Sequence, residues 1–87
     1  DGVTDLMLMA AEGNLKRVQE LVDYGALVNE CSHTGATALI YAARNGHRDV
    51  AEYLLSVGAD KSITTNKGST ARSIAERNGH SGIAAIL

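Results

Sequence analysis

The sequence lacks proline, tryptophan and phenylalanine, and it contains a single cysteine, Cys31, among 87 residues. One cysteine excludes a disulfide framework within the chain, and an unpaired thiol is typical of proteins in a reducing compartment. We therefore expect an intracellular protein, cytoplasmic or nuclear. No apolar run approaches the roughly 20 residues that span a membrane, and no signal-peptide pattern opens the chain. Because the chain starts without an initiator methionine, we expect it to be part of a larger protein.

Clustered positive charge is also absent. The net charge is −2, and acidic and basic residues are mixed along the chain. Nucleic-acid binding requires clustered Lys and Arg, so the sequence predicts neither a nucleic-acid partner nor a membrane partner. The apolar residues that are present are mainly Ala, Leu, Ile, Val and Met, which favour helices. With so few large side chains, we expect helices that pack closely through alanine.

An internal repeat of 33 residues organises the chain. The tetrapeptide Arg-Asn-Gly-His occurs at 44–47 and again at 77–80. Glycine and threonine keep the same period over most of the sequence, as Gly2, Gly35 and Gly68, Thr4, Thr37 and Thr70, Gly13, Gly46 and Gly79, and Gly25 and Gly58. Chance similarity would not hold these positions in step, so the sequence predicts three tandem copies of one unit.

Each copy is predicted to contain two helices. The repeated threonines are good N-caps, which predicts first helices at about 5–12, 38–45 and 71–78. The glycines that follow are typical of left-handed helix ends. Second helices are expected to start near Leu15, Arg48 and Ser81, with apolar residues at helical spacing. The polar segments 26–36 and 59–69 are predicted to be β-turn connectors that reach toward the next repeat.

The middle copy resembles the ankyrin repeat. Residues 35–47 read Gly-Ala-Thr-Ala-Leu-Ile-Tyr-Ala-Ala-Arg-Asn-Gly-His, and Val50, Leu54, Leu55 and Gly58-Ala-Asp60 follow. The family pattern is G-x-T-P-L-H-x-A-A-x-x-G-H, then apolar helix positions and G-A-D. The resemblance covers essentially the whole chain. It implies one all-α domain over 1–87, an ankyrin-repeat solenoid of three helix-turn-helix repeats at 1–34, 35–67 and 68–87.

The first helical turn departs from the family pattern. Its proline is replaced in all three copies and so is its histidine two positions later, by Asp5 and Met7, Ala38 and Ile40, and Ala71 and Ser73. The resemblance therefore implies that the usual Thr–His hydrogen bond is weakened or absent.

The outer copies carry charges where the middle copy is apolar. Arg17 and Glu20 take the places of Val50 and Tyr53, while Arg72 and Glu76 take those of Leu39 and Ala43. Terminal repeats need one polar face because no neighbour covers it. We therefore predict that 1–34 is an N-terminal cap and 68–87 a truncated C-terminal cap, which favours a monomer.

Catalytic and metal-binding chemistry is not predicted. His47 and His80 share a register one repeat apart, too distant to reach one Zn²⁺ together without large convergence. They are expected to cap the second helices or to bridge neighbouring repeats, while His33 is expected to be exposed. Cys31 has no lysine or arginine near it in sequence and is expected to be a free thiol, and the three tyrosines are expected to pack. We predict no enzyme activity and no cofactor.

Function is therefore expected from a binding surface. The resemblance implies that a partner protein contacts the turns and the exposed face of the first helices. Arg44, Lys67 and Arg77 make this surface basic toward the C-terminal half, so we expect a partner with an acidic patch. Alternatives are a structural scaffold that stacks on copies of itself, or a regulatory domain attached to an enzyme. The candidate contact residues are Val3, Ala11, Glu12, Cys31, His33, Thr34, Ala36, Arg44, Asn45, Thr64, Asn66, Lys67, Ser69, Arg77 and Asn78.

Overall fold

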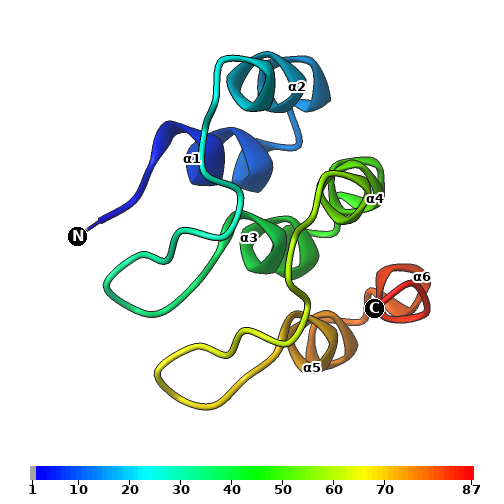
Figure 1. Cartoon of the computed structure of the whole chain (residues 1–87). Coiled ribbons are helices and arrows are strands. Elements are labelled where there is room, and N and C mark those ends of the chain that lie inside the picture. The colour runs from blue at the N-terminus through cyan, green and yellow to red at the C-terminus, as the bar shows by residue number, and fades with distance from the viewer. Residues whose placement is uncertain (1) are drawn as a thin grey trace.

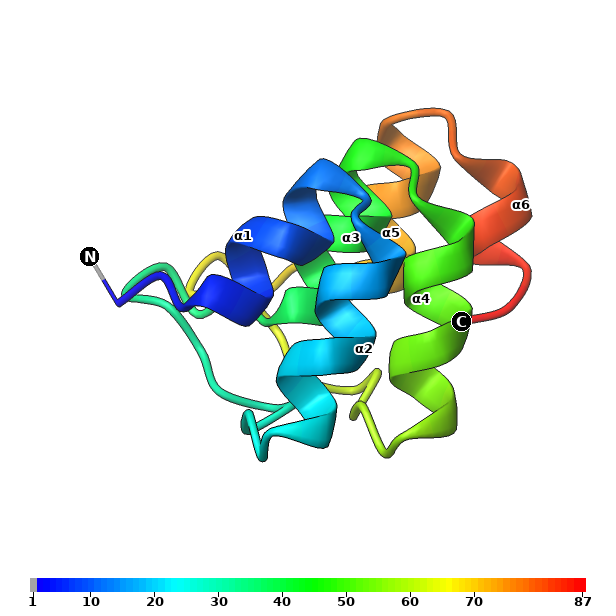
Figure 2. The same ribbon diagram turned by 90° about the horizontal axis from the view of Figure 1, so that it is seen from above.

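The computed structural model describes residues 2–87 and contains three pairs of antiparallel helices (Figure 1). The first helices α1, α3 and α5 form one layer, and the second helices α2, α4 and α6 form the other (Figure 2). No strand occurs within the described residues. The helices are α1 (Asp5–Glu12), α2 (Leu15–Asp23), α3 (Ala38–Asn45), α4 (Arg48–Ser56), α5 (Ala71–Arg77) and α6 (Ser81–Ala84). The prediction of an all-α stack of three helix-turn-helix repeats is confirmed.

Threonine begins each first helix, as the sequence predicted. The Thr4, Thr37 and Thr70 hydroxyls accept from backbone N–H groups three residues later, at 3.2, 3.3 and 3.1 Å. No histidine occupies position 7, 40 or 73, so the usual Thr–His hydrogen bond is absent, as predicted, but another side chain bonds the threonine in the third repeat. There the Thr70 N–H donates to Ser73 Oγ at 2.9 Å, because the short serine side chain places its hydroxyl oxygen within reach of the N-cap backbone. In the first repeat the acceptor is only the Met7 sulfur, at 3.4 Å.

The helix ends follow the glycine pattern closely. Gly13, Gly46 and Gly79 have φ of 76°, 82° and 79°, which confirms their left-handed conformation. Helices α2 and α4 end two residues before Gly25 and Gly58, at Asp23 and Ser56.

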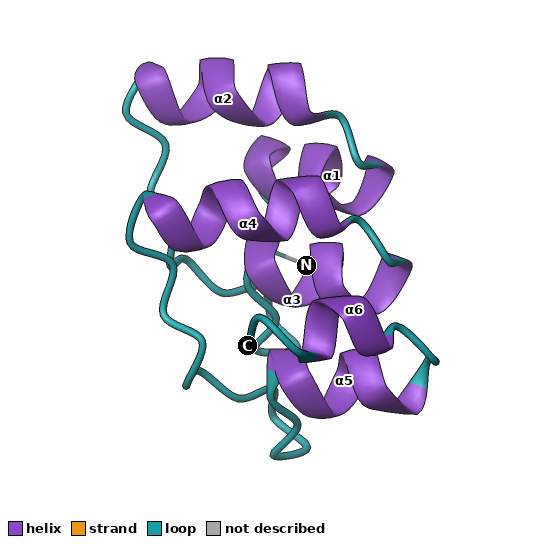
Figure 3. Ribbon diagram, turned by 90° about the vertical axis from the view of Figure 1, so that its right-hand side faces the viewer, coloured by secondary structure: helices purple, strands orange, loops and turns teal. Residues whose placement is uncertain are grey.

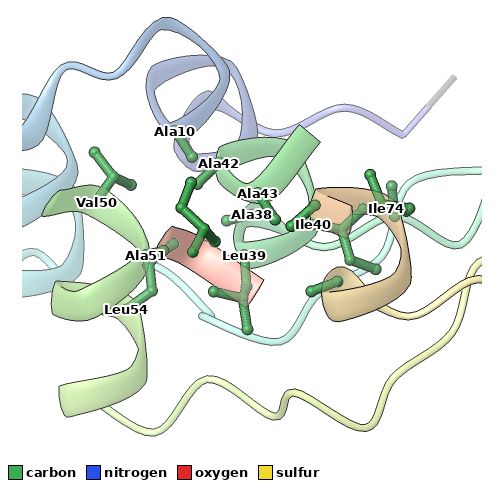
Figure 4. Close-up of a cluster of buried hydrophobic side chains, with 14 of the residues drawn as sticks. Ala10, Ala38, Leu39, Ile40, Ala42, Ala43, Val50, Ala51, Leu54 and Ile74 are labelled. Atoms are coloured by element: carbon green, nitrogen blue, oxygen red, sulfur yellow. The ribbon is translucent and has the colours of Figure 1, made fainter. Parts of the chain in front are cut away.

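Alanine allows the layers to approach closely. Ala10, Ala42, Ala43, Ala51 and Ala75 have no exposed surface, and the first four lie between neighbouring helices (Figure 4). Larger core side chains come mainly from the middle repeat, including Leu39, Ile40, Val50 and Leu54. Helix α3 packs between α1 and α5 and buries five of its eight residues. The middle repeat therefore holds the core together, as its apolar faces predicted.

Side chains of one repeat also cap the first helix of the repeat before it. The Ala11 carbonyl near the end of α1 accepts from Asn45 Nδ2 at 2.8 Å and contacts His47 Nε2 at 3.0 Å. Asn78 Nδ2 and His80 Nε2 contact the Arg44 carbonyl in the same way, both at 3.2 Å. These carbonyls lie in the last turn of a helix, where no intrahelical donor is available. Of the two roles predicted for the histidines, bridging of neighbouring repeats is confirmed.

Tyrosine packing was predicted correctly at only two of three positions. Tyr41 and Tyr53 are partly buried against the core, but Tyr24 is 87% exposed. Tyr24 is the C-cap of α2, so its side chain leaves the helix where no neighbouring element covers it. The packing prediction for Tyr24 is wrong.

The two ends of the stack differ in polarity. Arg17 and Glu20 form an exposed ion pair on α2 at 2.9 Å, and Arg72 and Glu76 form one on α5 at 3.5 Å. The second helices stack in one row, in which α6 is the shortest and ends the row beside α4 (Figure 3). The first repeat also exposes Leu8 and Leu27, at 47% and 68%. Polar and apolar surface thus coexist at the N-terminal end, and the assignment of caps stays a prediction.

Candidate functional site

The connectors form two projecting loops, which we call the first finger (residues 26–36) and the second finger (residues 59–69). Both extend to the same side of the first-helix layer (Figure 1). Each tip is a β-turn closed by a glycine N–H, from Gly35 to the Ser32 carbonyl at 2.9 Å and from Gly68 to the Thr65 carbonyl at 2.8 Å. The predicted β-turn connectors are thus confirmed.

Asn66 ties the two fingers together. Its backbone N–H donates to the Thr34 carbonyl at 2.9 Å, and its side-chain Nδ2 donates to the His33 carbonyl at 2.7 Å. The tips are therefore held side by side without forming a sheet. A partner meets a surface that is already arranged, which lowers the entropic cost of binding.

A groove of about 650 Å³ lies between the fingers and the helices α3 and α5. Its lining combines finger residues with residues of the two helices. Nine predicted contact residues line it, namely His33, Thr34, Ala36, Arg44, Asn66, Lys67, Ser69, Arg77 and Asn78. The structure adds Ile40, Thr65 and Ile74, which the sequence analysis had not included.

The remaining predicted residues lie outside this groove. Val3 packs partly against the core, Ala11 is partly buried, and the other four are exposed, namely Glu12, Cys31, Asn45 and Thr64. The structure therefore brings together predicted residues of the two fingers, α3 and the end of α5, and it leaves those at and before α1 apart.

One predicted contact residue is buried, and three others use their side-chain amides within the fold. Ala36 is only 3% exposed, so it belongs to the floor of the groove and offers almost no contact surface. Asn45, Asn66 and Asn78 donate their side-chain amides to backbone carbonyls of the preceding repeat. They are exposed, but their donors are used within the fold.

The floor of the groove is apolar and the rim is basic. Ile40 and Ile74 line its base and are nearly buried, at 2% and 7% exposed. Arg44, Lys67 and Arg77 line its sides, and no Asp or Glu of residues 2–87 is among the lining residues. The groove is therefore positive in a chain whose net charge is −2.

The two groove arginines differ from every other arginine of the described chain. Arg17, Arg48 and Arg72 each form an ion pair with a glutamate one helical turn later, at 2.9, 3.1 and 3.5 Å. Within residues 2–87, neither Arg44 nor Arg77 has such a carboxylate partner. The guanidinium of Arg44 instead lies over the Tyr41 ring, 4.7 Å from its centre. Arg77 Nη2 donates to Ser69 Oγ at 3.2 Å.

Nothing in the described residues assembles a catalytic or metal site. No cluster of three or more His, Cys, Asp or Glu among residues 2–87 could hold a metal ion. Cys31 is exposed, and its Sγ lies 3.8 Å from the Asn29 carbonyl. Hydrogen bonds from the Ser62 hydroxyl and backbone, at 2.6 and 2.9 Å, lower the pKa of Asp60, which lies outside the groove. Over the same residues, no helix has the length and apolar character needed to cross a membrane.

The fold defines a class of protein: short helical pairs stacked in register, with turns that project from one layer. The sequence model of the ankyrin repeat, in three copies, matches residues 6–87. The chain therefore belongs to the ankyrin-repeat family. Ankyrin repeats are generally protein–protein interaction modules and are generally non-catalytic. No curated protein matches the sequence.

Proposed function

We propose that this domain is a non-catalytic interaction module of a larger intracellular protein, and that its partner presents an acidic surface to the groove. The observation that carries the proposal is the charge of the lining: Arg44, Lys67 and Arg77 without a carboxylate among the described lining residues. The charges orient the partner and speed its approach, and the nearly buried floor adds a small apolar contact.

Affinity capture from the source cell tests this function. One bait is the wild-type domain, and a second bait is the double variant Arg44→Glu/Arg77→Glu, which reverses the charge of both groove arginines. The matched control is Lys16→Glu/Lys61→Glu, which changes the net charge equally at exposed lysines outside the groove. We expect proteins that bind to the wild type and the control and are lost from the groove variant. If all three baits retain the same proteins, the groove is not the binding surface.

The captured partner must then bind directly. Titration of the purified partner at low and at high salt should show weaker binding at high salt, because exposed charge pairs are screened. The groove variant should lose most of this salt dependence. Equal affinity of wild type and groove variant at low salt would contradict the acidic-partner proposal.

Self-assembly is the second candidate function, and exposed leucine on the first repeat favours it. Leu27 lines a shallow hollow of about 220 Å³ together with Leu6, Leu21 and Ala26. Contact of this surface with another copy would extend the stack. The ion pairs at both ends oppose such stacking, so we propose a monomer. Sedimentation velocity at several concentrations distinguishes the two, since stacking raises the sedimentation coefficient with concentration.

A further inference from the structure

We infer that the groove receives an extended segment of the partner with two carboxylates three positions apart and an apolar residue between them. Arg44 and Arg77 would each bind one carboxylate, and the apolar side chain would lie over Ile40 and Ile74. This inference rests on the proposed function and specifies the chemistry of the partner.

The first argument is that the two guanidiniums are free to pair and already positioned. The other three arginines of residues 2–87 are paired with glutamates, whereas Arg44 and Arg77 are held by an aromatic ring and a hydroxyl. Both supports leave guanidinium N–H groups available. A guanidinium binds a carboxylate through two parallel hydrogen bonds, which lysine cannot do.

The second argument is spacing. Arg44 and Arg77 occupy the same register of neighbouring first helices, α3 and α5, which pack against each other. Packed helices lie about 8–10 Å apart. A polyproline II segment has three residues per turn and rises about 3.1 Å per residue, so residues i and i+3 point the same way about 9 Å apart. Carboxylates at i and i+3 therefore match the general spacing of the two helices that carry the arginines.

The third argument is size, which favours an extended segment over a helix. Two α-helical positions that face one side at a similar separation are seven residues apart, about 10.5 Å along the axis. A helix of that length and about 10–12 Å in diameter occupies roughly 800 Å³ or more. The groove of about 650 Å³ is open to solvent, so its size favours the narrower extended segment without excluding a helix, and a helical peptide tests that alternative.

The floor accounts for the residue between the carboxylates. Ile40 and Ile74 expose only small areas, so a small side chain such as valine or alanine suits the site better than a large aromatic. Lys67 at the second fingertip adds a third positive charge to the rim and attracts the acidic segment from solution.

Fluorescence anisotropy with labelled synthetic peptides tests the inference. The probe contains Glu-Val-Ala-Glu between glycine and serine residues, and its matched control is Glu-Glu-Val-Ala, with the same composition and adjacent carboxylates. We expect the spaced peptide to bind about five- to tenfold more tightly, because only it engages both guanidiniums with charge-assisted hydrogen bonds. A helix-constrained peptide with glutamates seven positions apart should bind more weakly than the spaced peptide.

The protein variants identify the groups responsible. Arg44→Gln or Arg77→Gln should each abolish the preference for the spaced peptide, because one guanidinium cannot distinguish the two arrangements. Arg48→Gln, which removes an arginine outside the groove, should leave the preference unchanged.

Three results would overturn the inference. Equal binding of both peptides would refute the spacing, and tighter binding of the helical peptide would refute the extended conformation. Tighter groove-dependent binding of a labelled single-stranded oligonucleotide would replace the protein partner with a nucleic acid. If either peptide result overturns the inference, loss of the captured partner from Arg44→Glu/Arg77→Glu would still support the proposed function. Failure of the inference can therefore be distinguished from failure of the proposed function.

Discussion

Gly13→Ala is a direct test of how neighbouring repeats are coupled. Gly13 ends α1 at a φ of 76°, and the imidazole of His47 from the next repeat packs against it. A Cβ placed on Gly13 would overlap His47 Nδ1. The ring would have to move away, and its contact with the Ala11 carbonyl at 3.0 Å would be lost.

Gly79 provides the matched control for the backbone. Its φ is 79°, but nothing lies within 4 Å of a Cβ placed there. Alanine in a left-handed conformation costs roughly 1–2 kcal/mol at either site. Loss of the histidine bridge adds about 1 kcal/mol at Gly13 only, the usual net value of one hydrogen bond. We therefore expect Gly13→Ala to lower the free energy of unfolding by about 1 kcal/mol more than Gly79→Ala does.

Urea denaturation at 25 °C followed by circular dichroism measures this difference. For a small domain, about 1 kcal/mol separates the two midpoints by roughly 0.5 M urea. The double variant Gly13→Ala/His47→Ala removes the overlapping ring, so in that background Gly13→Ala should cost only the backbone term. Equal destabilisation by Gly13→Ala and Gly79→Ala, or equal cost of Gly13→Ala with and without His47, would refute the coupling.

Three further predictions concern the core, the carbonyl caps and pH. Leu39→Ala should lower the free energy of unfolding by about 2–5 kcal/mol, because Leu39 is 1% exposed, whereas Leu27→Ala should change it by less than about 0.5 kcal/mol, measured by urea denaturation. Asn45→Ala should lower the free energy of unfolding by about 1 kcal/mol in the same assay, because the Asn45 amide caps a helix carbonyl. Its control is Glu12→Ala, at the same register position one repeat earlier, which should be nearly neutral. The lowered pKa of Asp60 means that the folded state favours its charged form, so this stabilisation is present above the pKa of the unfolded chain and is lost as the pH falls through the folded pKa. The stability difference between wild type and Asp60→Asn should therefore shrink on acidification, and a difference that grows would contradict the assignment.

The fold could be predicted from the sequence because each repeat carries its own start and stop signals. Threonine hydroxyls and left-handed glycines act within one turn of the chain, so spacing alone located the helices. The errors arose where the outcome depends on atoms distant in sequence. Tyr24 has a large aromatic side chain of the kind that usually packs, but no neighbouring element covers it. Ser73 does not supply the family histidine, but its hydroxyl accepts the Thr70 N–H, a bond that the spacing alone did not predict.

The candidate site was predicted only in part, for a related reason. Register placed the fingers and first helices on one surface, and most of the contact residues predicted on the fingers do line the groove. Register does not show how deep a residue lies. Ala36 therefore counted as a contact residue although it is buried, and Ile40 and Ile74 were not predicted as contact residues although they line the groove.

The strongest functional signal was nevertheless local, and the sequence contains it. Stabilising ion pairs on a helix join residues three or four apart. Arg17, Arg48 and Arg72 each have a glutamate at that distance, and the structure pairs them. Residues three and four positions before and after Arg44 and Arg77 include no acid. An arginine on a helix without an acid three or four positions away, repeated at the 33-residue period, is therefore the pattern on which the proposed binding surface rests.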